Sequence, residues 1–307
     1  MSARILVCDP IDEEGIRRLM EADFEVDVKL AVSSEELKEI VSDYDALIVR
    51  SRTKVTKEII ERGKRLKVIG RAGTGLDNID VRSAEERGII VLNTPEAAAT
   101  AVAELTIGLI LSLARNIPLA DRSMKEGRWI KKDLRGWQLE GKTLGLIGLG
   151  NIGLRVAVIA KCLEMKILVT KRTPPSKELL NRLGARFVPL DDLLKESDIV
   201  SLHLPLSEET HRMIGSRELN LMKDGAYLIN TSRGAIVDEE ALLEALESGK
   251  LGGAALDVYG FEPPTDLRLV RLPNVVCTPH IGAQTEEAQR EASIMIAGKI
   301  IDLLAEQ

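Results

Sequence analysis

The chain alternates short apolar runs, of the length of a β-strand, with stretches in which apolar residues recur at helical spacing. In the first third of the chain, strands are predicted at 4–8, 24–28, 46–49, 68–70 and 89–92. The segments between them predict helices, and in the first helix Ile16, Leu19 and Met20 share one face. In the second half, strands are predicted at 142–147, 167–169, 199–201, 226–229, 254–256 and 275–277. Alternation of this kind indicates βαβ units and parallel sheets.

Because the pattern recurs in both halves, we expect an α/β protein with two doubly wound parallel-sheet domains. A last helix, predicted at 286–304, follows the final strand directly and is expected to cross back onto the first domain. The smaller domain would then comprise 1–97 plus 282–307, and the larger domain 98–281.

One predicted helix, 98–115, is apolar nearly all round and is therefore expected to be buried between the domains. Pro118 should bend or end it. Its longest apolar run, 105–113, is too short to span a bilayer.

Composition narrows the class of protein. The chain has 307 residues and a net charge of −6, which argues against a nucleic-acid-binding surface. Its three cysteines, Cys8, Cys162 and Cys277, lie far apart and in or beside apolar runs, so we expect buried thiols in a reducing compartment and no metal site. The first residues carry no secretory apolar segment. A cytoplasmic protein with no membrane partner is expected.

A glycine-rich turn is the strongest motif. The strand predicted at 142–147 runs into Gly148-Leu149-Gly150-Asn151-Ile152-Gly153, and a helical pattern follows. In a strand-to-helix turn, the first glycine permits the bend, the second lets the backbone approach a pyrophosphate, and the third lets the helix pack closely. The helix N-terminus adds donors and partial positive charge. The motif predicts dinucleotide binding, with a purely structural turn as the alternative.

Only three histidines are available as a general acid or base. His211 lies in a polar stretch and is expected at the surface, His203 follows a predicted strand, and His280 lies in a loop after a buried strand. Arg233 and Glu262 follow two further strands. Side chains at the carboxyl ends of parallel strands can converge on one crevice. The alternative is that each is a surface ion or a cap.

These segments, together with 49–53, 71–80 and 102–106, resemble the D-isomer-specific 2-hydroxyacid dehydrogenase family over essentially the whole chain. The resemblance implies a Rossmann nucleotide-binding domain and a smaller flavodoxin-like substrate domain. It implies that His280 exchanges a proton with the C2 oxygen while hydride passes between C2 and the nicotinamide. Glu262 would orient His280 and favour its protonated form. Arg233 would bind the substrate carboxylate and polarise the C2 carbonyl.

Family position implies further site residues. Those assigned to the cofactor, besides the glycine turn with Asn151 and Ile152, are Thr74, Leu204, Pro205, Thr231, Ser232, Asp257 and Gly282. Those assigned to the substrate, besides Arg233 and His280, are Arg50, Ser51, Arg52, Ala72 and Gly73.

Two departures from the family pattern matter. Ala97-Ala98-Ala99 replace the usual Gly-Asn-Ser, so side-chain contacts from that loop are missing. Lys171, followed by Arg172, stands where an acid would bind the ribose hydroxyls. Lys and Arg attract a 2′-phosphate, so the cofactor is expected to be NAD or NADP, with NADP favoured by this pair. A solvated loop is the alternative explanation of the pair.

Within the family, the chain most resembles the branch that oxidises D-3-phosphoglycerate to 3-phosphohydroxypyruvate at the start of phosphorylated serine biosynthesis. Arg50 and Arg52 follow a strand and are two residues apart, so both guanidiniums could reach one phosphate. The alternative is that one of them pairs with a nearby acid such as Asp43 or Asp45. No C-terminal regulatory domain is expected.

Two other functions stay open. One is an NADPH-dependent glyoxylate or hydroxypyruvate reductase, and the other is a nucleotide-sensing corepressor of the same fold. In each enzyme reading the partner is a small-molecule substrate. The resemblance also implies a homodimer through 105–113 and 124–129, which would bring Lys131 or Lys132 toward the partner's active site.

Overall fold

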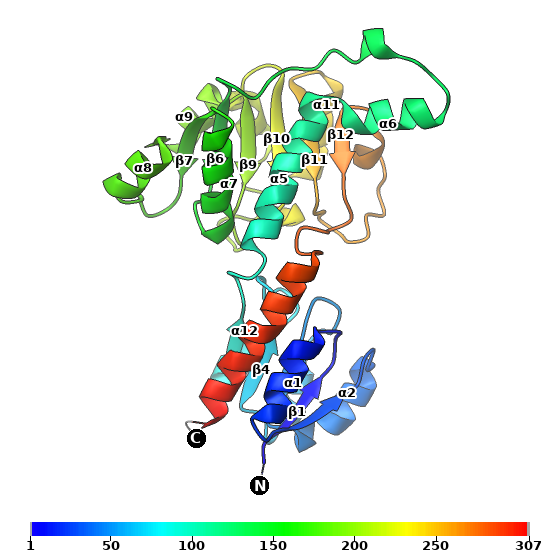
Figure 1. Cartoon of the computed structure of the whole chain (residues 1–307), viewed down its shortest axis with the longest axis vertical. Helices are drawn as coiled ribbons and strands as arrows, with labels where there is room; N and C mark the ends of the chain where they lie inside the picture. Colours follow the sequence, from blue (N-terminus) through cyan, green and yellow to red (C-terminus); the bar gives the residue numbers. More distant parts are fainter. Residues whose placement is uncertain (1, 306–307) are drawn as a thin grey trace. The chain divides into compact units, whose positions relative to one another are not determined.

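The computed structural model describes residues 2–305 and divides into two compact units (Figure 1). Unit 1 comprises residues 1–99 and 283–307, and unit 2 comprises residues 100–282. The predicted domain boundaries lie within two residues of this division.

Unit 1 contains a parallel sheet of five strands in the order β2-β1-β3-β4-β5, which is the flavodoxin-like order. Its strands are β1 (Arg4–Val7), β2 (Glu25–Val28), β3 (Ala46–Val49), β4 (Val68–Arg71) and β5 (Ile90–Asn93). Its helices are α1 (Glu13–Glu21), α2 (Ser34–Ile40), α3 (Lys57–Arg62), α4 (Val81–Glu86) and α12 (Glu286–Ala305), with the short turn η1 (Val41–Asp43).

Both faces of this sheet are covered. Helices α2, α3 and α4 pack on one face, and α1 with α12 packs on the other (Figure 1). Ile296 and Ile300 of α12 come so close to β4 that a Cβ on Gly70 would lie 2.8 Å from each of them. The predicted crossing of the last helix back onto the first domain is confirmed. Of Ile16, Leu19 and Met20, which were predicted to share one face of α1, only Leu19 is buried. Met20 is 52% exposed, because the buried side of the helix is centred on Gly15 and Leu19.

Unit 2 contains a parallel sheet of seven strands in the order β12-β11-β10-β9-β6-β7-β8. Its strands are β6 (Thr143–Ile147), β7 (Lys166–Thr170), β8 (Ala185–Phe187), β9 (Ile199–Leu202), β10 (Ala226–Asn230), β11 (Leu251–Leu256) and β12 (Val275–Cys277). The strand order reverses between β6 and β9, as it does at the ligand crevice of Rossmann folds. The predicted fold class, with a Rossmann and a flavodoxin-like domain, is confirmed.

Helices cover both faces of the second sheet as well. Helices α5 and α7 pack on one face, and α9, α10 and α11 pack on the other. The helices of unit 2 are α5 (Ala99–Ala114), α6 (Ile117–Lys125), α7 (Asn151–Cys162), α8 (Lys177–Leu183), α9 (Leu190–Glu196), α10 (Ser216–Leu221) and α11 (Glu239–Glu247), with the short turns η2 (Lys131–Asp133), η3 (Gly234–Ile236) and η4 (Leu269–Arg271).

The predicted break near Pro118 is confirmed. Helix α5 ends at Ala114, Asn116 adopts the left-handed conformation with φ of 52°, and Pro118 lies in the first turn of α6. Within residues 2–305 no single helix is long and apolar enough to cross a membrane, and α5 with α6 meets those criteria only as a pair bent by 67°.

The cysteines differ from expectation. Cys8 is buried, but Cys162 and Cys277 are exposed, so the prediction of three buried thiols is wrong for these two. Cys162 is the last residue of α7, where the helix turns away from the core, and Cys277 ends the edge strand β12.

Candidate active site

The chemically active segments of unit 2 all follow parallel strands at the carboxyl edge of its sheet. The glycine turn follows β6 and His203 follows β9, the two strands between which the order reverses. Residues 231–233 follow β10, residues 257–262 follow β11, and residues 278–282 follow β12. Parallel strands bring these five segments to one edge, which is where α/β proteins bind ligands.

The glycine turn has the geometry that dinucleotide binding requires. Gly148 has φ of 98°, and a Cβ there would lie 2.2 Å from the carbonyl oxygen of His203. A Cβ on Gly153 would lie 2.4 Å from the carbonyl oxygen of Gly148. A Cβ on Gly150 would meet nothing within 4 Å, and its extended backbone does not itself require glycine. Open space therefore lies beside Gly150, at the N-terminus of α7. The first N–H groups of this helix have no acceptor inside it, which is the arrangement that binds phosphate groups in other proteins.

The positions expected to bind the ribose follow β7 directly. Lys171 is half-buried and Arg172 is exposed. Arg172 lies near Glu209, where its charge helps to lower the pKa of that carboxyl, behind the larger effect of the Ser207 hydroxyl. Two basic residues therefore follow β7, at the position where the family pattern has an acid.

Asp257 shapes the turn that carries His280. Its carboxylate is buried, and one oxygen accepts hydrogen bonds from the Thr278 hydroxyl (2.6 Å) and the Ile281 N–H (2.8 Å). The other oxygen accepts from the Gly282 N–H at 2.9 Å, and the Asp257 carbonyl accepts from the His280 N–H at 2.8 Å. Its side chain thus organises the loop after β12, whereas family position assigned it to the cofactor.

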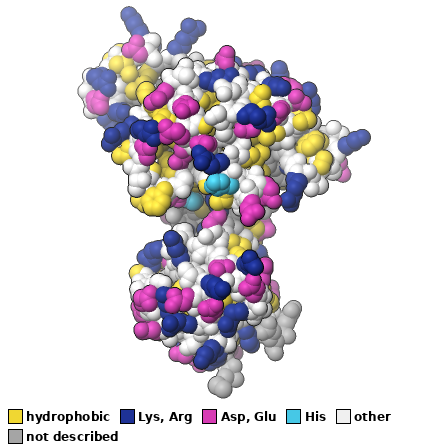
Figure 2. Space-filling model, turned by 180° about the vertical axis from the view of Figure 1, so that it is seen from behind, with side chains coloured by type: hydrophobic (Ala, Val, Ile, Leu, Met, Phe, Trp, Pro, Cys, Tyr) yellow, Lys and Arg dark blue, Asp and Glu magenta, His cyan; other side chains and the backbone are white. Residues whose placement is uncertain are grey.

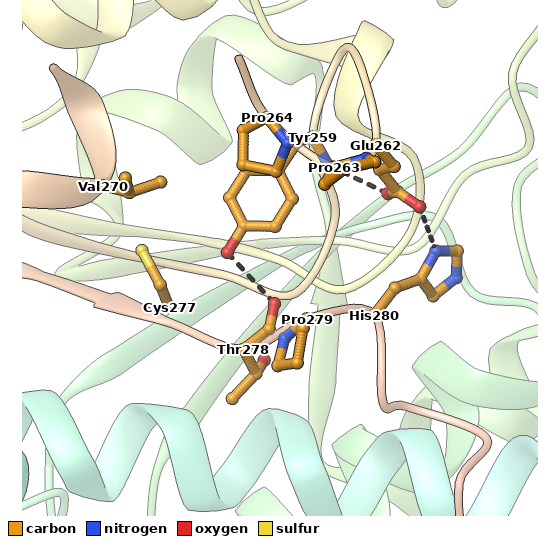
Figure 3. Close-up of a pocket in the computed structure, with 9 residues that line it drawn as sticks. All are labelled: Tyr259, Glu262, Pro263, Pro264, Val270, Cys277, Thr278, Pro279 and His280. Carbon is orange, nitrogen blue, oxygen red and sulfur yellow. Dashed lines mark hydrogen bonds and ion pairs between the residues drawn. The ribbon is translucent and has the colours of Figure 1, made fainter. Parts of the chain in front are cut away.

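His280 and Glu262 form a close pair. His280 Nδ1 lies 2.6 Å from Glu262 Oε2, and their side chains are 48% and 36% exposed (Figure 3). A carboxylate can only accept, so Nδ1 donates and Nε2 is left to exchange a proton. The other Glu262 oxygen accepts from the Tyr259 N–H at 3.1 Å, which fixes the carboxylate.

Tyr259 joins these segments together. Its hydroxyl is 3.2 Å from the Leu256 carbonyl oxygen and 3.0 Å from that of Thr278 (Figure 3). Burial raises the pKa of this hydroxyl well above its usual value, so it remains a donor at neutral pH. Beside it is a cavity of about 400 Å³, lined by Tyr259, Glu262, Pro263, Pro264, Val270, Cys277, Thr278, Pro279 and His280.

Arg233 is held against the same segment. A Cβ on Gly234 would lie 1.9 Å from the backbone carbon of Tyr259, so only glycine allows the two loops this approach. The Asn230 side chain donates to the Arg233 carbonyl oxygen at 2.9 Å and accepts from the N–H and hydroxyl of Ser232. Arg233 Nη1 donates to the Ser232 carbonyl oxygen at 2.6 Å. Arg233, Glu262 and His280 therefore belong to loops fixed to one another within unit 2.

The remaining residues assigned to the cofactor in unit 2 lie at the same edge. Leu204 and Pro205 follow β9, and Thr231 and Ser232 are buried at the end of β10. The Thr231 hydroxyl lies 2.9 Å from that of Thr106 on α5. His211 is exposed, as expected.

The other assigned residues lie in unit 1, at the carboxyl edge of its own sheet. Arg50, Ser51 and Arg52 follow β3, while Ala72, Gly73 and Thr74 follow β4. Arg52 Nε lies 3.4 Å from a carboxylate oxygen of Asp9. The alternative, an arginine paired with a nearby acid, is therefore met by Arg52, but the acid is Asp9. Asp45 pairs with Arg65 instead, and the Asp43 carboxylate accepts from Ser42.

Gly73 has φ of 151°, and a Cβ there would lie 2.3 Å from Nη1 of Arg71. The Thr74 carbonyl oxygen accepts from the Asn93 side chain at 2.6 Å.

Among residues 2–305, no group of three or more His, Cys, Asp or Glu side chains is arranged to hold a metal ion.

Comparison with known proteins agrees with this geometry. Residues 107–282 match the model of the NAD-binding domain of D-isomer specific 2-hydroxyacid dehydrogenases, which is more than half of the chain. The chain belongs to this family. The resemblance found in the sequence motifs is thereby confirmed.

Individual members of the dehydrogenase family are similar over nearly the whole chain. The hydroxypyruvate reductase of Thermotoga maritima is 51% identical over 97% of both chains. The D-3-phosphoglycerate dehydrogenase of Methanocaldococcus jannaschii is 48% identical over 98% of this chain, which spans 57% of that relative's length. The crystal structure of Aquifex aeolicus D-lactate dehydrogenase, complexed with NAD and lactic acid, superposes with a TM-score of 0.87 at 30% identity over 99% of this chain and 96% of that one.

The sequence analysis missed three residues that organise these loops. Tyr259, Asp9 and Asn78 each bond to segments far away in the sequence or to backbone atoms. The signal available for Asp9 and Tyr259 was their position two and three residues after the apolar strands β1 and β11, which they share with many structural residues.

Proposed function

We propose that the chain is an NAD(P)-dependent dehydrogenase that oxidises D-3-phosphoglycerate to 3-phosphohydroxypyruvate. The observation that carries the proposal is the 2.6 Å hydrogen bond between His280 and Glu262, at the same edge of the sheet as the glycine turn. A histidine oriented by a carboxylate is the arrangement that general acid–base catalysis uses.

The residues of unit 2 divide the work as follows. His280 Nε2 takes the proton of the C2 hydroxyl during oxidation and returns it during reduction. Glu262 holds the ring and stabilises the imidazolium that forms. Arg233 binds the carboxylate of the substrate with its planar fork of donors. The nicotinamide, when bound, supplies the hydride-transfer chemistry.

We propose that Lys171 and Arg172 let the enzyme use NADP. The residues of the glycine turn, with Asn151 and Ile152, fit a pyrophosphate, and the basic pair replaces the acid that repels a 2′-phosphate. Family position assigns further residues to the cofactor: Thr74, Leu204, Pro205, Thr231, Ser232, Asp257 and Gly282.

The variant Lys171→Glu tests the role of the basic pair. It should reduce kcat/KM with NADP much more than kcat/KM with NAD. Equal reductions with the two cofactors would mean that Lys171 and Arg172 belong to a solvated loop and do not select the cofactor.

The phosphate end of the substrate is assigned to Arg50, Ser51 and Arg52, with Ala72 and Gly73 following the neighbouring strand. Two guanidiniums suit a dianionic phosphate, which a substrate with one carboxylate does not need. The name of the Methanocaldococcus jannaschii relative supports the same substrate. By the same resemblance we assign the enzyme to serine biosynthesis, the cytoplasm and a homodimer.

A second candidate is a hydroxypyruvate reductase that works in the opposite direction. The observation that favours it is the Thermotoga maritima relative, which carries that name and matches this chain over 97% of its length. The two functions share their chemistry and differ in whether a phosphate is recognised.

The test is the reductive reaction with 3-phosphohydroxypyruvate, hydroxypyruvate and glyoxylate, each with NADH and NADPH. We expect the phosphorylated substrate to have the highest kcat/KM and Arg50→Ala to reduce that value by about tenfold to a hundredfold more than the value for hydroxypyruvate. Preference for hydroxypyruvate would establish the reductase. Absence of turnover with every substrate would favour the corepressor-like binding protein.

A further inference from the structure

We propose that Asp9 and Asn78 are positioning residues that hold segment 50–53 as a preformed site for the phosphate group of a substrate. This inference rests on the proposed function, because it concerns the same arginines. It adds two residues that bind no substrate themselves, and all of the geometry lies within unit 1.

Asp9 fixes segment 50–53 through hydrogen bonds from the segment to its carboxylate. It follows β1, is 1% exposed, and one of its oxygens accepts from the N–H groups of Arg50 (2.6 Å) and Thr53 (3.1 Å). The other oxygen accepts from the Thr53 hydroxyl at 2.8 Å and lies 3.4 Å from Arg52 Nε. A buried carboxylate is costly unless such donors surround it. Asp9 thus fixes the two ends of a four-residue segment at their N–H groups.

Asn78 holds the same two residues at their carbonyl groups. Its side-chain nitrogen donates to the carbonyl oxygen of Arg50 at 2.8 Å and to that of Thr53 at 2.6 Å. The backbone carbonyl oxygen of Asn78 accepts from the N–H of Val55 at 2.8 Å, which binds Asn78 to the chain two residues beyond the segment. Arg50 and Thr53 therefore have both backbone groups bound, one by an acid and the other by an amide.

The middle of the segment faces outward. Ser51 and Arg52 are exposed, and within residues 2–305 their N–H groups make no hydrogen bond to the protein. The Arg52 side chain is 56% exposed, and the Arg50 guanidinium makes one long bond of 3.3 Å to the Pro10 carbonyl oxygen. Two backbone donors, the Ser51 hydroxyl and the Arg52 guanidinium are thus exposed on a segment whose ends are fixed, and the half-buried Arg50 side chain adds a second guanidinium at its start. This is a donor set suited to a phosphate dianion.

Fixing the segment in advance has a physical purpose. A flexible loop would lose conformational freedom on binding, and a preorganised one avoids that loss. The Asp9 carboxylate also lies beneath two neighbouring cations, so it reduces their mutual repulsion before the ligand arrives. Asp9 and Asn78 should therefore affect the affinity for phosphorylated ligands and leave hydride transfer unaffected.

The experiment compares Asp9→Asn, Asn78→Ser and the matched pair Thr53→Val and Thr53→Ser. Thr53→Val removes the hydroxyl that bonds to Asp9, whereas Thr53→Ser keeps it. Each protein is assayed with 3-phosphohydroxypyruvate and with hydroxypyruvate, and its affinity for inorganic phosphate is measured by calorimetry. We expect Asp9→Asn, Asn78→Ser and Thr53→Val to raise KM for the phosphorylated substrate and Kd for phosphate by about tenfold, while Thr53→Ser does neither. The kcat with hydroxypyruvate should change less than twofold.

Losses that are equal for the two substrates, or an unchanged Kd for phosphate in the variants, would overturn the positioning role. If the wild-type protein neither binds phosphate nor prefers the phosphorylated substrate, the proposed function itself fails, and this outcome is distinct from the first. Should Asp9→Asn not fold, the Thr53 pair answers the same question with a smaller change.

Discussion

His280 adopts a backbone conformation that few residues other than glycine adopt. Its φ is 54°, and such a conformation costs about 1 kcal/mol or more for an ordinary side chain. Three consecutive N–H groups, of His280, Ile281 and Gly282, are bound by Asp257, which holds the turn in place. The strained turn directs the imidazole toward Glu262.

The first prediction concerns the His280 side chain. His280→Asn removes the group that exchanges the C2 proton, so kcat should fall by roughly 10²- to 10⁴-fold. The affinity for the reduced cofactor, measured by fluorescence titration, should stay unchanged because the glycine turn is untouched. Turnover close to that of the wild type would contradict the assignment.

His203 predicts a pH dependence of stability. This residue is half-buried, and its ring has one partner among residues 2–305, the Ser201 hydroxyl, 2.9 Å from Nε2. Its Nδ1 is buried without a partner, and desolvation lowers the pKa of the ring from 6.5 to about 4. The unfolded chain binds a proton between these values and the folded chain does not, so stability falls as pH decreases from about 6.5 to about 4. Across this window the loss should approach roughly 3 kcal/mol.

The measurement is the urea midpoint of wild type and His203→Gln between pH 4 and 7. The difference in urea midpoint between wild type and His203→Gln should become smaller as the pH decreases. The control His211→Gln changes an exposed histidine, and its midpoint should vary with pH as that of the wild type does. Parallel curves for wild type and His203→Gln would show that His203 does not titrate in this way.

The sequence was most informative about residues whose role follows from their position after a strand. Arg233, Glu262 and His280 were singled out for that reason, and the fold brings their loops together. Tyr259, Asp9 and Asn78 act through hydrogen bonds to distant backbone groups, which leave no periodic pattern. Their roles required the tertiary structure.

Among the elements, the loops at the carboxyl edge of the second sheet are joined to one another. The loop after β11 contacts the loop after β10 through Gly234, and it contacts the loop after β12 through the Tyr259 hydroxyl. Elements with long apolar runs were predicted within a residue or two. The three-residue strand β8 was not predicted, because so short a pattern cannot be separated from a loop. The helices α8 to α11 were not assigned individually, although they are as long as the predicted helices α1, α3 and α4.

Tyr259→Phe tests this joint. The change removes the hydroxyl and leaves the Thr278 carbonyl oxygen without its donor, so stability should fall by about 1 kcal/mol. Because the 278–280 turn loosens, kcat should also decrease severalfold. Tyr44→Phe is the matched control, since it removes a buried hydroxyl that donates to Asp27 in unit 1 and should affect stability alone. Equal kcat values in the two variants would contradict the role of Tyr259.

The surface of the whole molecule carries charged side chains of both signs and a smaller number of exposed apolar side chains. Lys and Arg side chains are interspersed with Asp and Glu over both units on the face shown in Figure 2, in keeping with the modest net charge of −6. Large exposed apolar side chains occur in both units, and the segment after α5 carries three of them, with Ile117 49%, Met124 56% and Trp129 76% exposed. Exposed apolar side chains of this size can form part of an interaction surface.

We expect this surface to form a homodimer. Sedimentation velocity should give a dimer at micromolar concentration for the wild type and a larger monomer fraction for Met124→Glu. Val158→Glu places the same charge on α7, where Val158 is 47% exposed, and should leave the dimer intact. A wild-type monomer at that concentration would refute the prediction.

Helix α12 gives the first unit a peculiar order of assembly. Ile5, Val7 and Ile48 lie on one face of the first sheet, and the side chains that cover them include Ile296 and Ile300, which are encoded about 250 codons after Ile48. After β5 has been synthesised every strand of the sheet exists, but until α12 follows, α1 is the only one of the described helices available to cover that face. The second unit, made of one continuous segment, can mature first. A nascent chain stalled before α12 should therefore expose aliphatic side chains on this face of the first sheet. Chaperones that recognise exposed aliphatic surface should bind the stalled chain at that face.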